Sequence, residues 1–289
     1  MNGDNVQPAS EVAKLALARS LHKKSQMIAS FRTAGAFVAC LAFLGWPFHP
    51  VEADDRASVA PALARADALD FRMRAELRDE YVDFQQGGGA NMIVPRLDYA
   101  VSPAFSLRVE APVVTSGPDL AGQSNQAGFG DLLFRGSYRA IRGTGYAAVV
   151  GAEVIFDTAS EASLGYGKDV LAPLAYASIE IPRFRSVLFP FIQHYFTVGG
   201  DDSRPDVNYT SVKAAVLNRW QGRYYSVVEP QLVVDHERSD RVGMTLEAEG
   251  GRFLTRQMTV WARPGLGLFG DDLPQVYNWN LKVGVRYTF

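Results

Sequence analysis

The chain has 289 residues, of which 47% are hydrophobic and 21% are charged, and its mean hydropathy is only −0.05. This length suits one large all-β domain or two small ones. A net charge of −2 excludes a broad basic surface of the kind that binds nucleic acid, so we expect no nucleic-acid partner. The single cysteine, Cys40, cannot support a disulfide framework.

Residues 27–53 contain the three parts of a secretory signal peptide. Arg32 supplies a positive charge, Ala34 to Trp46 form an apolar core, and Val51-Glu52-Ala53 supplies the small residues that a signal peptidase requires. We predict cleavage after Ala53. A membrane-anchor helix is the alternative, but spanning a bilayer takes about 20 apolar residues and this core is shorter.

Two segments flank the predicted signal peptide. Residues 1–26 precede it and are polar, so Met27 is an alternative start of the chain. Residues 54–68 are polar and rich in alanine without a strand pattern. We expect them to form a periplasmic lead-in to a folded domain that covers residues 69–289.

From Leu69 onward, apolar and charged residues alternate with a period of two. In this first stretch Leu69, Phe71 and Met73 share one face, whereas Arg72 and Arg74 share the other. Strand spacing separates the two groups completely, whereas helical spacing would mix them. The same pattern predicts twelve strands, with ten and fourteen as alternatives. They cover residues 69–84, 93–101, 105–110, 132–139, 146–156, 170–181, 186–198, 207–218, 223–235, 242–251, 258–269 and 277–289.

Short and long connections alternate between these strands. Short turns are expected near residues 102–103, 142–143, 182–185, 220–222 and 255–256, and long polar links near 85–90, 116–127, 158–169, 199–206, 236–241 and 270–276. Outer-membrane barrels have short periplasmic turns and long external loops. A soluble β-sandwich is the alternative, and it gives no reason for such alternation. The predicted fold is therefore a closed antiparallel transmembrane β-barrel of the outer-membrane type.

The C-terminal stretch carries the clearest alternation. One face has Leu281, Val283, Val285, Tyr287 and Phe289, and the other has Lys282 and Arg286. In a soluble protein such a strand would form an aggregation-prone edge, whereas in a barrel it pairs with the first strand, 69–84. The stretch is similar to the C-terminal recognition signal of outer-membrane barrels. This similarity implies insertion into outer-membrane lipid by the barrel assembly machinery, through the strand that ends at Phe289.

Several short motifs resemble the outer-membrane family named for the MetA pathway of phenol degradation, whose members are described as transporters. The motifs are Gly128–Leu133, Val154–Thr158, Leu164–Gly167 and Glu229-Pro230-Gln231. The chain departs from the family at Asp157-Thr158-Ala159, where the usual sequence is Pro-Thr-Gly. The resemblance covers most of the expected barrel. It implies an outer-membrane location and the passage of small, aromatic or apolar compounds.

The predicted inner faces of the first strands carry many charges of both signs. They are Arg72, Arg74, Glu76, Arg78, Arg96, Asp98, Arg108, Glu110, Asp131, Arg135, Arg139 and Glu153. An Arg or Lys facing lipid at the midplane would cost about 2–4 kcal/mol, so we assign these side chains to the lumen. All but Arg78 and Arg139 are candidates for contact with a small-molecule permeant. The alternative interpretation is a set of ion-pair ladders that fill a narrow barrel.

Two other functions compete with the passage of molecules. One is a closed barrel with a structural or adhesive role, and the other is a lipid-modifying enzyme with a Ser–His pair on its exterior. His194 lies mid-strand without a nearby serine, and His236 lies in a loop beside Asp235 and Glu237. Neither belongs to a recognisable nucleophile motif. We therefore expect no enzymatic activity, no cofactor and no metal site.

Overall fold

The computed structural model describes residues 71–117, 125–161, 163–220, 223–271 and 273–289. The expected signal region, 1–53, and the expected lead-in, 54–68, lie outside the described residues. No helix in the described part of the chain is long and apolar enough to cross a membrane.

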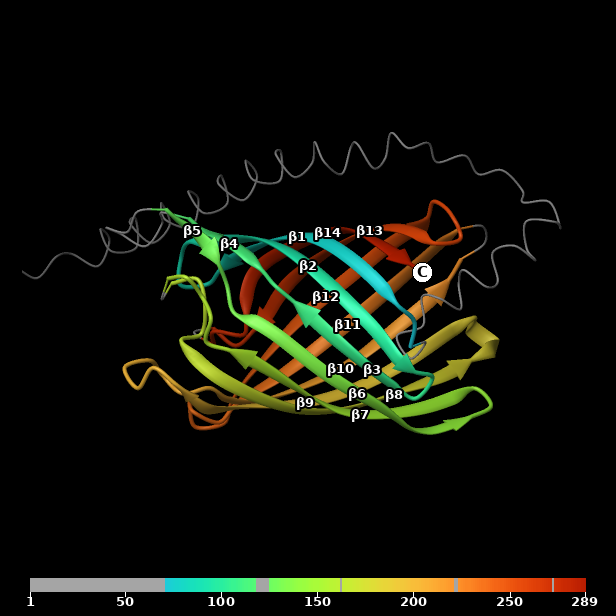
Figure 1. Ribbon diagram of the computed structural model, residues 1–289, viewed down its shortest axis with the longest axis horizontal. Helices are drawn as coiled ribbons and strands as arrows, with labels where there is room; N and C mark the ends of the chain where they lie inside the picture. The colour runs from blue at the N-terminus through green and yellow to red at the C-terminus, as the bar shows by residue number, and fades with distance from the viewer. Residues whose placement is uncertain (1–70, 118–124, 162, 221–222, 272) are drawn as a thin grey trace, which may run out of the picture. The chain divides into compact units, whose positions relative to one another are not determined.

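Fourteen strands and one short 3-10 helix, η1 (Pro182–Phe184), make up the described structure (Figure 1). The strands are β1 (Arg74–Phe84), β2 (Gly89–Ser102), β3 (Phe105–Glu110), β4 (Val113–Ser116), β5 (Gln126–Phe129), β6 (Leu132–Gly143), β7 (Tyr146–Phe156), β8 (Lys168–Ile181), β9 (Ser186–Gly200), β10 (Asn208–Arg219), β11 (Tyr224–Asp235), β12 (Arg241–Phe253), β13 (Met258–Phe269) and β14 (Tyr277–Thr288).

These strands form one antiparallel sheet that closes on itself. β1 pairs with both β2 and β14, which joins the first strand of the sheet to the last. β3 and β4 both pair with β2, one after the other, so they are two halves of a single wall strand. β5 and β6 are likewise two halves of the next wall strand, because β4 pairs with β5 and β3 pairs with β6. The barrel therefore has twelve antiparallel wall strands, as predicted.

The two interruptions lie beside each other and form what we call the seam, residues 111–112 and 130–131. Pro112 has no N–H group for a ladder hydrogen bond, and its carbonyl accepts a bond of 2.9 Å from the Gly130 N–H. A Cβ on Gly130 would meet Val114 Cγ2 at 2.8 Å, so glycine allows this close approach. The strands β4 and β5 beyond the seam were not predicted, since their pattern is too short to recognise.

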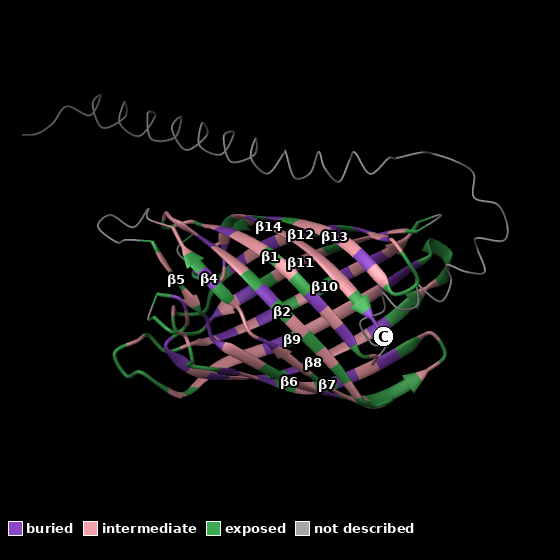
Figure 2. Cartoon of the chain, turned by 45° about the horizontal axis from the view of Figure 1, so that its top comes forward, coloured by how far each residue is buried: buried purple, intermediate pink, exposed green. Residues whose placement is uncertain are grey.

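Alternate residues of each strand face the interior and the exterior. In β7, Val149 and Glu153 are 1% and 2% exposed, whereas Tyr146 and Val150 are 53% and 48% exposed. Figure 2 shows this alternation of buried and exposed residues along neighbouring strands. The exterior carries large exposed apolar side chains on almost every strand, including Leu77, Ile93, Leu97, Tyr99, Leu107, Phe134, Tyr138, Ile192, Val212, Val228, Leu266 and Tyr287. The predicted assignment of faces is confirmed at Leu77, Ile93, Leu97, Tyr99, Leu107, Phe134, Tyr138 and Tyr287.

The start of the first strand differs from the prediction. β1 begins at Arg74, and Phe71 is not on the apolar exterior. Its ring packs against Ala147 and Val149 on the inner face of β7, and the Arg139 guanidinium lies 4.8 Å from its centre. Because Phe71 precedes the hydrogen-bonded wall, the period of two no longer determines which way its side chain points. Met73, whose carbonyl accepts from the Phe289 N–H at 3.0 Å, is exposed as predicted.

The two ends of the barrel differ as predicted, except that the long link expected at 85–90 is a short connection of residues 85–88 between β1 and β2. One end, here called the turn end, carries the short connections after β2, β6, β8, β10 and β12. The other, the loop end, carries the longer connections after β7, β9, β11 and β13, together with the link between β4 and β5. Tight geometry at the turn end includes positive φ at Gly145 and Arg185.

Candidate functional site: the barrel interior

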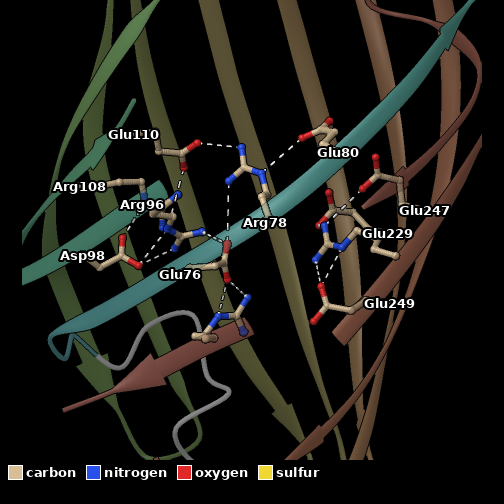
Figure 3. A network of polar contacts seen from close by, with 12 residues as sticks. Glu76, Arg78, Glu80, Arg96, Asp98, Arg108, Glu110, Glu229, Glu247 and Glu249 are labelled. Atoms are coloured by element: carbon tan, nitrogen blue, oxygen red, sulfur yellow. Dashed lines mark hydrogen bonds and ion pairs between the residues drawn. The ribbon is translucent and has the colours of Figure 1, made fainter. Parts of the chain in front are cut away.

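Cross-strand pairing brings the predicted inner charges of β1, β2 and β3 into one network. Glu76 lies opposite Arg96, Asp98 opposite Arg108, and Arg96 opposite Glu110 in the strand register. Facing side chains on neighbouring strands are close enough to interact, and opposite charges attract. Arg78 Nη2 is 2.8 Å from Glu110 Oε2, and Arg96 Nη2 is 2.6 Å from Asp98 Oδ2. Figure 3 shows Arg78 between Glu110 and Glu80.

The network continues in both directions around the wall. On one side Arg286 of β14 lies opposite Glu76, with Nη2 at 2.6 Å from Glu76 Oε2. On the other side Arg108 lies opposite Arg135 of β6, which in turn lies opposite Glu153 of β7. Arg135 Nε donates to Glu153 Oε2 at 2.7 Å. Ion pairs thus join β14, β1, β2 and β3, and the Arg135–Glu153 pair of β6 and β7 lies beside this network, next to the like charge of Arg108.

A second cluster, on β10 to β14, was missed by the sequence analysis. Arg263 Nη2 lies 2.6 Å from Glu249 Oε2, and Lys282 Nζ lies 2.8 Å from Glu247 Oε1. Lys282 also reaches Glu80 at 3.4 Å, which links the two clusters. The alternation in these later strands is less regular. However, the spacing of Glu247 and Glu249 by two residues was a signal that both share the inner face.

Apolar residues occupy the interior near the turn end. Val187, Leu217, Tyr225 and Phe253 form a buried cluster there, although inner positions were expected to be polar. Two pockets of the interior have volumes of about 10 and about 20 Å³. A void of about 10–15 Å³ holds one water molecule, so these pockets are small. Side chains therefore fill most of the space around both pockets.

Asp131 was predicted to line the lumen, but the structure gives it another role. It lies at the seam, outside the strands, and its carboxylate accepts N–H bonds from Thr158 (3.2 Å), Ala159 (3.0 Å) and Tyr166 (2.6 Å) of the β7–β8 loop. Burial raises the pKa of Asp131, and the three N–H donors act in the opposite direction. Asp131 is therefore an anchor for this loop.

The anchored β7–β8 loop folds against the inner wall at the loop end. Leu164 is 5% exposed and packs on Ala90 and Val114, which are inner residues of β2 and β4. Arg204 of the next loop donates from Nη2 to the Gly165 carbonyl at 3.2 Å. The loop therefore narrows the interior at this end.

A separate group of polar side chains lies on the exterior near the loop end. The Thr210 hydroxyl is 3.0 Å from His194 Nδ1 and 2.9 Å from His236 Nε2, and His236 Nδ1 is 2.6 Å from Asp240 Oδ1. Sequence reasoning treated the two histidines separately because His194 lies on β9 and His236 lies in the loop after β11. The strand register brings Thr210 opposite His194.

No family model matches the chain, and no curated protein matches its sequence. Among solved structures, the COG4313 outer membrane channel from Pseudomonas putida F1 aligns with a TM-score of 0.63 at 12% identity, over 76% of this chain and 96% of that one. The NanC porin aligns with a TM-score of 0.56 at 9% identity, over 74% and 100% of the two chains. The KdgM porin aligns with a TM-score of 0.52 at 12% identity, over 75% of this chain and 99% of that one.

The fold is that of an outer-membrane β-barrel. At these levels of identity the likeness concerns the fold alone. The resemblance to the family named for the MetA pathway of phenol degradation stays an expectation, because no family model matches.

Proposed function

We propose that this chain is an outer-membrane channel that lets small molecules pass through a narrow, charged lumen. The observation that carries the proposal is the network of ion pairs on the inner face of a closed barrel whose outer face is apolar. A polar interior enclosed by an apolar exterior is the arrangement of membrane pores. The channel and porin folds of the structural neighbours support the same function.

The proposal includes an orientation and a route of assembly. The turn end faces the periplasm and the loop end faces the outside, because external loops of such barrels are the longer ones. The signal peptide is removed after Ala53, and the barrel assembly machinery recognises β14. Lipid then surrounds the exposed apolar exterior.

Channel activity is tested with the purified protein in planar bilayers. We expect discrete channel events of small conductance, because side chains fill most of the space around both interior pockets. Heat-modifiable migration on SDS gels serves as the control that the barrel is folded. A folded barrel that gives neither channel events nor solute flux into liposomes would instead be a closed barrel with a structural or adhesive role.

Contact between lipid and the exterior is tested by Val150→Arg. Val150 lies at the middle of β7 and points outward, so the charge should lower the free energy of unfolding in lipid vesicles by about 2–4 kcal/mol. Urea titration, monitored by tryptophan fluorescence, measures the free energy of unfolding of each variant. Glu161→Arg, at an exposed position of the β7–β8 loop, is the control and should change stability by less than about 0.5 kcal/mol. Equal effects of the two changes would show that Val150 does not touch hydrocarbon.

A lipid-modifying enzyme is the second candidate, favoured by the arrangement of Thr210, His236 and Asp240 on the exterior. A hydroxyl, an imidazole and a carboxylate in hydrogen-bonded sequence are the parts of a nucleophile and its activating base. The assay measures fatty-acid release from phospholipid and lipid A vesicles. Release that is abolished by His236→Ala, with channel conductance unchanged, would establish this second activity. No release from the folded protein would leave the channel as the sole proposal.

A further inference from the structure

Arginines gather at the turn end, where strands β6 to β13 meet their short connections. They are Arg142, Arg183, Arg185, Arg219, Arg223, Arg252 and Arg256. In the described residues of this region, 140–146, 179–187, 218–220, 223–226 and 252–258, Glu180 is the only carboxylate. The loops after β7, β9 and β11 at the opposite end instead carry mainly carboxylates, such as Asp157, Asp201 and Asp240. The turn end is therefore the positively charged end of the barrel.

Three of these arginines have no carboxylate beside them. Arg183, Arg185 and Arg223 are exposed, and none of them forms an ion pair with another described residue. Arg223 Nη1 donates to a neutral acceptor, the Leu254 carbonyl, at 3.0 Å. In the lumen, by contrast, Arg263 lies among three glutamates. A guanidinium group without a carboxylate presents paired N–H donors that match the oxygens of a phosphate.

The fold brings the arginines of neighbouring turns together. The Arg185 carbonyl, which ends the β8–β9 turn, accepts from the Arg219 N–H at 3.2 Å. The Arg223 carbonyl, at the start of β11, accepts from the Phe253 N–H at 2.8 Å, next to the β12–β13 turn. Three consecutive turns are thus hydrogen bonded to one another. We call the exposed or half-buried arginines that they present, Arg183, Arg185, Arg223 and Arg252, the arginine rim.

Aromatic rings lie among the arginines of the rim. Phe184 is 68% exposed, and the Arg183 guanidinium lies 5.8 Å from the centre of its ring. The Arg252 guanidinium lies 5.4 Å from the centre of the Tyr224 ring. Aromatic side chains of membrane proteins gather at the boundary between hydrocarbon and headgroups. These rings therefore place the arginine rim at the depth of the lipid headgroups.

Trp220 marks the same depth on the outer face of the barrel. Its indole is 58% exposed and donates to Ser226 Oγ at 2.9 Å. Ser226 lies on β11 between Tyr225 and Val227, which both pack in the interior, so Ser226 faces outward. Trp220 is therefore a reporter of the lipid next to the rim.

We propose that the arginine rim binds the phosphate groups of anionic phospholipids, such as phosphatidylglycerol, in the membrane leaflet at the turn end. The guanidinium groups bind phosphate oxygens, and the neighbouring rings pack on the glycerol and the upper acyl chains. A cell-wall polymer or another soluble polyanion would use the same charges but would gain nothing from the exposed rings. The inference goes beyond the proposed channel function and rests only on its premise that lipid surrounds the exterior.

The test uses Trp220 as the reporter of bound lipid. In the Trp279→Phe variant of the mature protein, the other described tryptophan, Trp261, is 4% exposed and lies inside the barrel. The folded variant is placed in phosphatidylcholine vesicles that contain equal fractions of brominated phosphatidylglycerol or brominated phosphatidylethanolamine, because bromine quenches indole fluorescence on contact. We expect about tenfold or greater preference for phosphatidylglycerol at the rim, and a smaller preference at high salt. Equal quenching by the two lipids would overturn the proposal.

A matched pair of variants in this background assigns the preference to the rim. The first replaces Arg183, Arg185 and Arg223 by Gln; at Arg185, where φ is 52°, glutamine meets the same backbone restriction as arginine. The second removes the same charge at the loop end by replacing Arg204, Arg238 and Arg241 by Gln. We expect the preference for phosphatidylglycerol to fall about tenfold or more in the first and to change by less than about twofold in the second. Equal losses would overturn the assignment.

The outcomes also separate this inference from the proposed function. Quenching of Trp220 by neither lipid would reject lipid contact at the exterior together with the rim. Equal quenching by both would keep the lipid contact and reject the rim alone. The measurement does not use conductance, so a closed barrel would leave its result unchanged. Retention on isolated cell-wall sacculi that the first variant loses, without any lipid preference, would assign the rim to the cell wall and overturn the proposal.

Discussion

Replacing Glu153 by leucine is expected to lower the free energy of unfolding by about 3–5 kcal/mol, because the change leaves the Arg135 guanidinium buried without its carboxylate. Glu153 is 2% exposed, and it accepts from both Nε and Nη2 of Arg135. Within the described residues Arg135 has no second ion pair. Urea unfolding of the protein in lipid vesicles, followed by tryptophan fluorescence, measures the loss.

The double variant Arg135→Leu with Glu153→Leu is the control for this prediction. It removes both charges, and replacing a buried pair by apolar residues is often close to neutral. We therefore expect it to recover most of the stability that Glu153→Leu loses. If the double variant is as unstable as the single one, the loss comes from packing rather than from the unpaired charge.

Asp131→Ala is expected to raise single-channel conductance about twofold or more, since it releases the β7–β8 loop from the inner wall. The alanine removes the acceptor of three backbone N–H bonds, and hydrogen bonds to charged groups contribute about 1.5–3 kcal/mol each. Leu164 then loses its fixed place on Ala90 and Val114. Faster proteolysis between residues 157 and 167 provides a second measurement.

The control for the loop prediction is Asp202→Ala. Asp202 is an exposed carboxylate on the neighbouring β9–β10 loop, so its removal changes the local charge by the same amount and leaves the anchor intact. The single-channel conductance of the Asp202→Ala variant should match that of the unmodified protein. A rise of the same size in both variants would mean that charge at the loop end, and not the position of the β7–β8 loop, sets the conductance.

The fold was predictable because a period of two determines the face of each residue in a strand. In β7, for example, Tyr146 and Val150 were assigned to the exterior and Glu153 to the interior, and the structure confirms each. The number of wall strands followed from counting such segments. The start of β1 was wrong because Phe71 precedes the ladder, and alternation has no meaning for a residue that makes no strand pairs.

The ion pairs were less predictable than the faces. Alternation indicates that Arg135 and Glu153 both point inward, but only the register across β6 and β7 shows that they pair. Asp131 was assigned to the lumen because it precedes an alternating segment. Its role as an anchor depends on N–H groups more than 25 residues away, which no local pattern reveals.

The same limit explains the exterior group around Thr210. Its members come from β9, β10 and the loop after β11, so no spacing in the sequence connects them. Ser239 and Asp240 of this loop both have positive φ, a conformation that residues other than glycine adopt at an energetic cost.

The seam at Pro112 and Gly130 is a point where the hydrogen bonding of the barrel wall is interrupted. An uninterrupted ladder resists changes in cross-section, because widening it at any point breaks hydrogen bonds along a whole strand. Here the ladder is interrupted, and the bonds from the Ala111 N–H to the Pro95 carbonyl and from the Gly130 N–H to the Pro112 carbonyl bridge it, so fewer bonds resist a change of cross-section at the seam than along an unbroken strand. Because Asp131 lies at the seam and accepts three N–H bonds from the β7–β8 loop, the position of that loop depends on the cross-section of the barrel at this point.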